Sequence, residues 1–167
     1  MKKRNNKGFT LIELLIVVAI IGIIVAIAIP NLLNAIQRAK QKRTMGDMRT
    51  AGTAAEAYAV DFNRYPAAAG YTLPSGFSLP TTTFGNPSPP SGFCLQVTPT
   101  YVRVLPISDG WNSFFLYGGG GQNYGVVSNG KDGSAEGTLA YGETTNFNND
   151  IIFIDGQFVQ YPAGAQN

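Results

Sequence analysis

Residues 9–29, FTLIELLIVVAIIGIIVAIAI, form an apolar run that only Thr10 and Glu13 interrupt. At about 1.5 Å of rise per residue, a helix of this length measures roughly 32 Å. The hydrocarbon core of a bilayer is about 30 Å thick, so the run matches one passage through a membrane. The sequence therefore predicts a membrane-spanning helix ahead of any globular part of the chain.

Three interpretations of this run compete: a permanent anchor, a cleaved secretory signal, and a segment that first anchors the chain and later joins an assembly. The basic residues before the run and the small residues around Ala26-Ile27-Ala28 favour a signal peptide. Glu13 argues against it, because a carboxylate in hydrocarbon is costly and a secretory signal has no use for one. The helical pattern also continues past that cleavage site.

The composition removes most enzyme chemistry. The chain of 167 residues has no histidine and one cysteine, Cys94. A histidine-based triad, a Cys/His zinc site, an iron–sulfur cluster and an internal disulfide bond are therefore excluded. Basic residues gather before the apolar run and between Arg38 and Arg49, whereas acids outnumber bases after residue 59. The acidic remainder argues against a nucleic-acid partner.

The junction Lys7-Gly8-Phe9-Thr10-Leu11-Ile12-Glu13 joins a short basic leader, which ends in glycine, directly to the apolar helix. In this motif the sequence resembles the type IV pilin and pseudopilin superfamily. The resemblance implies that residues 1–8 are a leader peptide, that a prepilin peptidase cuts between Gly8 and Phe9, and that Phe9 becomes N-methylated. Residues 9–30 would then be the transmembrane and assembly helix.

Glu13 needs a partner, because an unpaired charge in hydrocarbon costs several kcal/mol. No Lys or Arg lies between Gly8 and Arg38. Cleavage would create a cation, the α-amine of Phe9, four residues from the acid. We hypothesise that the amine of one subunit meets Glu13 of an adjacent, staggered subunit, and that this charge match sets the stagger during filament assembly. The alternative is a polar residue tolerated near the membrane interface.

Charge counting leaves the orientation open, because similar numbers of cations flank both ends of the apolar run. These cations are Lys2, Lys3, Arg4 and Lys7 on one side, and Arg38, Lys40, Lys42 and Arg43 on the other. The resemblance implies a single-pass protein of the bacterial inner membrane with a cytoplasmic N-terminus. After assembly, the remainder would stand in a periplasmic or surface filament.

Gly22 and Pro30 weaken the helix, Gly22 through its low helix propensity and Pro30 through a lost hydrogen bond to Ala26. The resemblance implies that this region loses helix in filaments, whereas the simpler interpretation is a kink.

The pattern predicts an amphipathic helix over residues 31–65. Its apolar positions recur at mostly three- or four-residue steps: Leu32, Leu33, Ile36, Ala39, Met45, Met48, Gly52, Ala55, Tyr58 and Phe62. The basic residues between Arg38 and Arg49 either contact anionic lipid headgroups or simply face solvent. The helix should end before Pro66, and Tyr58–Pro66 resembles the helix ending of major pseudopilins from type II secretion.

Residues 66–92, rich in Pro and Gly, predict a connecting loop, and residues 93–167 predict a C-terminal β domain. Strands are expected at 93–97, 101–105, 113–117, 124–128, 151–154 and 157–161, in a small antiparallel sheet. Asp155-Gly156 predicts a hairpin turn, Gly118–Gly121 a mobile turn, and Trp111 a core anchor. Cys94 is expected as a buried, inert thiol in a strand.

The polar stretch 128–137 and the later Asn149-Asp150-Ile151 resemble, with an insertion, the calcium-binding loop of major pseudopilins. The resemblance makes Asp132 and Asp150 candidate ligands for a structural calcium ion, since calcium takes six to eight oxygen ligands. No other cofactor is expected. The competing interpretation is a solvated loop with Asn and Gly turns.

Together these features predict an α+β, pilin-like fold in which one long helix packs on a small antiparallel sheet. The predicted function is a non-enzymatic filament subunit of type II secretion. Its expected partners are further copies of the chain, the prepilin peptidase, an assembly platform protein with its ATPase, minor pseudopilins and the inner membrane. One alternative is the major subunit of an extracellular type IV pilus. A remote one is a membrane-anchored periplasmic enzyme that uses Asp132, Glu136, Glu143 and Asp150.

Overall fold

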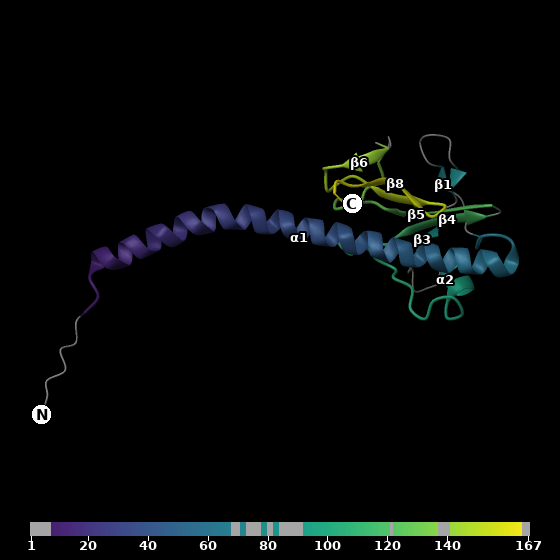
Figure 1. Cartoon of the computed structure of the whole chain (residues 1–167), viewed down its shortest axis with the longest axis horizontal. Coiled ribbons are helices and arrows are strands. Elements are labelled where there is room, and N and C mark those ends of the chain that lie inside the picture. Colours follow the sequence, from purple (N-terminus) through teal and green to yellow (C-terminus); the bar gives the residue numbers. More distant parts are fainter. Residues whose placement is uncertain are drawn as a thin grey trace, which may run out of the picture. The chain divides into compact units, whose positions relative to one another are not determined.

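The computed structural model describes residues 8–67, 71–72, 78–79, 82–83, 92–120, 122–136 and 141–164. The chain divides into two compact units, Met1–Arg38 and Ala39–Asn167. The elements, labelled in Figure 1, are α1 (Leu11–Phe62), β1 (Tyr71–Thr72), β2 (Ser78–Leu79), β3 (Thr82–Thr83), α2 (Gly92–Val97), β4 (Leu116–Gly120), β5 (Asn123–Ser128), β6 (Gly142–Thr144), β7 (Ile151–Ile154) and β8 (Gln157–Pro162). The predicted α+β class with a long N-terminal helix is confirmed.

Both ends of α1 carry recognisable caps. Thr10 precedes the first turn and shares hydrogen bonds with Glu13, which is the capping-box arrangement. At the other end, Asn63 adopts a positive φ of 53°, as a residue just after a helix often does. The helix therefore ends at Phe62, three residues earlier than the predicted limit at residue 65. Pro66 follows the cap and prevents the helix from resuming.

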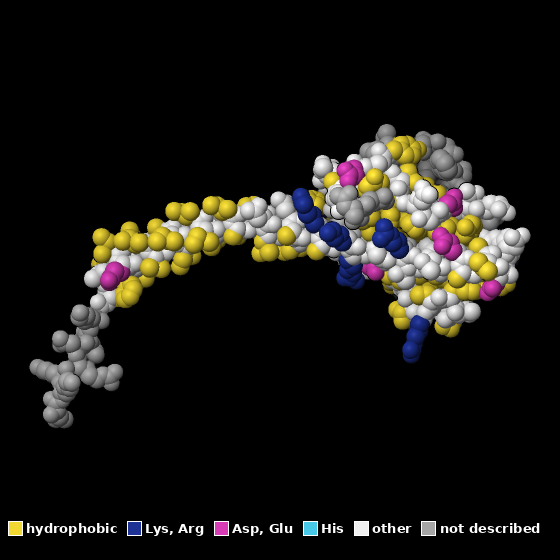
Figure 2. All heavy atoms as spheres, in the orientation of Figure 1, with side chains coloured by type: hydrophobic (Ala, Val, Ile, Leu, Met, Phe, Trp, Pro, Cys, Tyr) yellow, Lys and Arg dark blue, Asp and Glu magenta, His cyan; other side chains and the backbone are white. Residues whose placement is uncertain are grey.

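In the first unit, the helix exposes apolar side chains on every side, and Figure 2 shows those of one face. Every large hydrophobic side chain from Phe9 to Ile36 is more than two-fifths exposed. This segment is long and apolar enough to cross a membrane. The helix is continuous through Gly22 and Pro30 in the single chain. Loss of helix there within a filament stays a prediction.

In the second unit, one face of α1 is buried, and the buried positions recur at steps of three or four residues. They are Gln41, Thr44, Met45, Met48, Ala51, Gly52, Ala54, Ala55 and Tyr58. This part of α1 lies against the sheet, as Figure 1 shows. Tyr124 of β5 donates a hydrogen bond to Glu56 of the helix at 2.7 Å. The predicted packing of an amphipathic helix on the sheet is confirmed.

The main sheet has the strand order β3-β4-β5-β7-β8-β6. All neighbours are antiparallel except β6 and β8, which are parallel. The predicted small antiparallel sheet is thus present with one departure, a parallel pair at its edge. After β5 the chain crosses to the far edge beside β8, and this crossover makes the final pair parallel. The predicted hairpin turn between β7 and β8 is confirmed, because Asp155 and Gly156 both have positive φ.

Four local predictions need correction. Residues 93–97 belong to helix α2, so half-buried Cys94 lies in a helix and not in a strand. Residues 101–105 form turns and irregular backbone, without a strand. Gly118–Gly120 belong to β4, paired with β5, so the predicted turn there was wrong. The connecting segment 66–92 contains the short strands β1–β3, although most of it lies outside the described residues. Trp111 packs on the core as predicted.

Two glycines of α1 allow a matched test of helix–sheet packing. A Cβ at Gly52 would lie 2.9 Å from the Tyr124 hydroxyl and closer still to the Phe153 ring, whereas one at Gly46 meets nothing within 4 Å. Gly52→Ala should therefore destabilise the fold by about 1–3 kcal/mol through overpacking. Gly46→Ala should stabilise it by up to about 1 kcal/mol through helix propensity. Thermal unfolding of the full chain in detergent, followed by the fluorescence of Trp111, checks both. Equal effects would contradict close packing at Gly52.

Candidate functional site

The candidate processing site lies just outside the first helix. Gly8, Phe9 and Thr10 are exposed and have no regular secondary structure, and α1 begins at Leu11. The side chain of Phe9 is 78% exposed. The peptide bond between Gly8 and Phe9 is therefore free of helical hydrogen bonds, and a protease can take it up without unwinding a turn of α1.

Glu13 lies in the first turn of α1, where Thr10 is its neighbour. Both the backbone N–H and the hydroxyl of Thr10 donate to Glu13 Oε2, at 2.8 and 2.7 Å. The backbone N–H of Glu13 donates in return to the Thr10 hydroxyl at 3.3 Å. The acid thus has a structural role within one chain, in addition to the predicted role between chains. Sequence reasoning missed Thr10, although Thr-x-x-Glu before an apolar helix is a readable capping signature.

The second candidate site surrounds Asp150. This carboxylate is buried, and its Oδ2 accepts a hydrogen bond from the backbone N–H of Glu136 at 3.0 Å. Its Oδ1 and the Oδ1 of Asn129 are buried without a hydrogen-bond partner. The pKa of Asp150 is raised to about 7. Burial has the largest effect and raises it, the backbone hydrogen bond from Glu136 lowers it, and the negative charges of Glu136 and Asp132 raise it. Asp150 is therefore a buried carboxylate with one unsatisfied oxygen, and the charges of Glu136 and Asp132 act on it.

The side-chain oxygens of this loop are of the type that calcium binds. Asp150 and Asn129 offer unsatisfied oxygens, and Asp132 is exposed with Oδ1 accepting from the backbone N–H of Ser134 at 3.0 Å. Glu136 Oε2 accepts from Gln160 at 2.6 Å, which fixes the other end of the loop on β8. However, no group of three or more metal-binding side chains is assembled among the residues that the structure describes. The chemistry fits calcium, and ligand binding stays a prediction.

The raised pKa of Asp150 predicts a pH dependence of stability. Folded protein keeps the Asp150 proton up to about pH 7, whereas an unfolded chain releases it near the ordinary value of 3.8. The free energy of unfolding of metal-free protein should therefore fall as the pH rises from about 4 to 7, and this contribution should level off above that range. Asp150→Asn should abolish the trend, while the exposed Asp132→Asn should keep most of it. Unfolding midpoints measured across this range with a chelator test the prediction. A wild-type trend identical to that of Asp150→Asn would contradict it.

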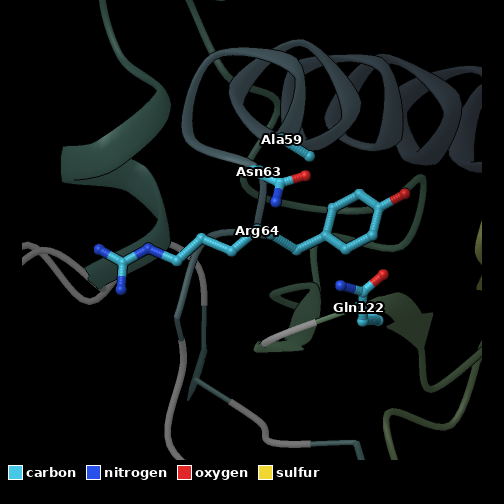
Figure 3. A pocket seen from close by; sticks show the side chains of 5 residues that line it. Ala59, Asn63, Arg64 and Gln122 are labelled. Carbon is cyan, nitrogen blue, oxygen red and sulfur yellow. The ribbon is translucent and has the colours of Figure 1, made fainter.

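One pocket of about 200 Å³ lies beside the end of α1, lined by Ala59, Asn63, Arg64, Tyr65 and Gln122. Figure 3 shows the Arg64 side chain extending away from Asn63 and Gln122. None of the four acids considered for an enzyme lines this pocket. Asp150 is buried, and the exposed Glu143 accepts a hydrogen bond from the backbone N–H of Gly164. This pocket therefore lends no support to the enzyme alternative.

Comparison with known proteins adds two family matches. Residues 3–29 match the prokaryotic N-terminal methylation motif, and residues 31–147 match the family described as type II secretion system, protein G. The type II secretion system core protein G of Pseudomonas aeruginosa is 29% identical over 87% of this chain and 100% of its own length. That of Vibrio cholerae is 30% identical over 88% of this chain and 95% of its own length.

A pilin is also similar, over a shorter stretch. The type IV wide pilus major component of Thermus thermophilus is 52% identical over 62 residues, which are 37% of this chain and 47% of that protein. No solved structure matches the chain significantly.

Proposed function

Because the chain belongs to the protein G family of type II secretion systems, we propose that it polymerises, without enzymatic activity, into a helical filament that drives protein export. The single observation that carries this proposal is the first part of α1, which exposes large apolar side chains on every side. A helix that is apolar all round is stable only within lipid or among other helices. Membrane storage followed by polymerisation supplies both environments in turn.

The proposed life of the chain begins in the bacterial inner membrane, with the N-terminus in the cytoplasm. A prepilin peptidase would cut between Gly8 and Phe9 and methylate Phe9, in keeping with the methylation motif. Lipid is as apolar as the helices, so the hydrophobic effect gives no drive for leaving the membrane. An assembly platform protein with its ATPase, and minor pseudopilins that start the filament, would supply that drive. Gly22 and Pro30 would let the helix lose turns in the filament.

The comparisons favour secretion over an extracellular pilus. The similarity to secretion proteins extends over most of the chain, whereas the similarity to the Thermus pilin covers 37% of it. The helix ending before Pro66 and the polar stretch 128–137 both lie within the match to protein G, which ends before Asp150.

Deletion of the gene tests this choice. Secreted enzymes should accumulate in the periplasm of the deletion strain, while long, shearable surface fibres should remain. Restoring the gene should restore export, and a chain with a blocked Gly8–Phe9 cleavage should not. Loss of surface fibres with normal export would instead assign the chain to a type IV pilus.

We also propose that the loop around Asp150 binds a structural calcium ion. Asp132, Asp150 and Asn129 are the ligands that the described residues offer. Calcium would compensate the repulsion between the carboxylates and use the unsatisfied oxygens. Added calcium should raise the unfolding midpoint of chelator-treated protein, and more so at pH 8 than at pH 5, because the ion competes with the Asp150 proton. An unfolding midpoint unchanged by calcium at both pH values would contradict calcium binding by this loop.

A further inference from the structure

α1 contains a long uncharged segment that has charged residues immediately before and after it. Residues 14–37 contain no Asp, Glu, Lys or Arg, and Glu13 and Arg38 stand immediately outside them. Four cations then follow within six residues: Arg38, Lys40, Lys42 and Arg43, which we call the basic collar. The first acid after them is Asp47. The end of the uncharged segment is therefore strongly and locally positive.

The length of this segment puts the collar at the surface of a membrane. The 24 uncharged residues form a helix roughly 36 Å long. The hydrocarbon core of a bilayer is about 30 Å thick, and a modest tilt of the helix accommodates the difference. Before assembly, Glu13 then lies near one interface and Arg38 near the other, and Glu13 enters fully apolar surroundings only within the filament. From Arg38 to Arg43 the helix rises about 7.5 Å, close to the thickness of one headgroup layer.

Among the described residues, acidic side chains leave most of the collar's charge unpaired. Its only ion pair within the described part of the protein joins Arg43 to Asp47 at 3.5 Å, and the Arg43 side chain remains 70% exposed. Arg38 and Lys42 are also exposed. Lys and Arg side chains gather along α1 in Figure 2, where the apolar stretch of the helix gives way to the second unit. An exposed cluster of one sign at this depth is suited to a surface of the opposite charge.

We propose that the basic collar binds the phosphate groups of anionic phospholipids in the leaflet next to the folded domain, and that this contact fixes the depth of α1 before assembly. The inference rests on membrane insertion of α1, as part of the proposed function. The collar would oppose sliding of the helix in either direction, because its cations are costly in hydrocarbon and favourable beside phosphate. Assembly would then exchange these lipid contacts for contacts with neighbouring subunits.

Lipid selection by the full chain tests this proposal. The chain is reconstituted in phosphatidylcholine nanodiscs with a trace of spin-labelled phosphatidylglycerol or spin-labelled phosphatidylcholine, and electron spin resonance gives the relative affinity for the two lipids. One variant combines Arg38→Gln, Lys42→Gln and Arg43→Gln. The control combines Arg64→Gln, Arg103→Gln and Lys131→Gln, which removes the same charge from other exposed positions. The leader cations are common to all three chains, so their contribution cancels.

The wild-type chain and the control should both prefer phosphatidylglycerol at low salt. In the collar variant, the affinity for phosphatidylglycerol relative to phosphatidylcholine should fall roughly fivefold for each removed cation that contacts a phosphate. High salt should abolish the difference between the collar variant and the control. Equal preferences in the collar variant and the control would overturn the proposal. If the wild-type chain failed to insert into the nanodiscs, the proposed membrane insertion would be wrong. If it inserted but showed no preference for phosphatidylglycerol, only the lipid contact of the collar would be wrong.

Discussion

Replacement of Gly8 by leucine is expected to leave the chain at its full length of 167 residues, with no mature form starting at Phe9. A Cβ at Gly8 would meet nothing within 4 Å, so the substitution does not disturb the chain's own fold. The Gly8–Phe9 bond also lies before the helix, where backbone hydrogen bonds do not protect it. Any loss of cleavage therefore reports on the fit of the residue before the cut into the peptidase.

Intact-mass spectrometry of membrane fractions measures this outcome directly. Wild-type material should show a mature chain that lacks residues 1–8 and carries one N-methyl group on Phe9. Gly8→Ala, which adds one methyl group, should be cut partly, and Gly8→Leu should not be cut. Both variants should still enter the membrane, because the apolar segment is unchanged. A mature terminus at any residue other than Phe9, or normal processing of Gly8→Leu, would contradict the assignment of the cleavage site.

The features predicted correctly from the sequence depend on local patterns. The apolar run, the three- and four-residue spacing of Met45, Met48 and Tyr58, and the Asp155-Gly156 turn each carry their structural meaning within a few residues. Such patterns give a helix face or a turn without knowledge of distant partners. The long helix, the face that it buries and the last hairpin were therefore accessible before any coordinates.

The features missed depend on contacts between distant segments. Residues 93–97 form a short apolar run, and a run of this length fits a helix or a strand equally well. The parallel pairing of β6 with β8 follows from the route of a long crossover, which no local pattern encodes. Buried Asp109 is a further example, because it accepts hydrogen bonds from Trp111, Ser113 and Ser128 and so shapes the loop next to α1.

The candidate sites divide in the same way. Gly8, Phe9 and Glu13 form a short contiguous motif, so the sequence indicated them together. For the calcium loop, the sequence indicated Asp132 and Asp150, but not that the side-chain oxygens of Asn129 and Asp150 would be buried without hydrogen-bond partners. The burial that raises the pKa of Asp150 arises from tertiary packing and is invisible in the sequence.

A Glu13→Gln chain is expected to be inserted and processed normally but to assemble filaments at least about a hundredfold less efficiently. The proposed pair joins Glu13 of one subunit to the Phe9 amine of a neighbour in an apolar bundle. Glutamine leaves that amine unpaired, and an unpaired charge in such surroundings costs about 3–5 kcal/mol. A cost of this size for each added subunit shifts the assembly equilibrium by two orders of magnitude or more.

The structure supplies a control that separates charge from helix capping. Glu13 also accepts hydrogen bonds from Thr10, and Thr10→Ala removes the hydroxyl of that cap while it keeps the acid. Glutamine can still accept a hydrogen bond from Thr10, so Glu13→Gln keeps the cap while it removes the charge. The two variants thus divide the two roles of one side chain between them. Loss of the cap should cost the helix only about 1 kcal/mol.

Electron microscopy and shearing assays, normalised to the amount of processed subunit, measure assembly for both variants. If charge pairing sets the stagger, Thr10→Ala should assemble nearly as well as the wild type and Glu13→Gln should fail. If the helix cap is what matters, Thr10→Ala should fail and Glu13→Gln should assemble.

Mixing Glu13→Gln chains with wild-type chains sharpens the test. A Glu13→Gln subunit still has its own amine, so it can pair with a wild-type neighbour on one side only. Trace amounts should therefore be incorporated, and larger fractions should shorten filaments progressively, whereas a subunit with a merely weakened helix would dilute filaments without shortening them.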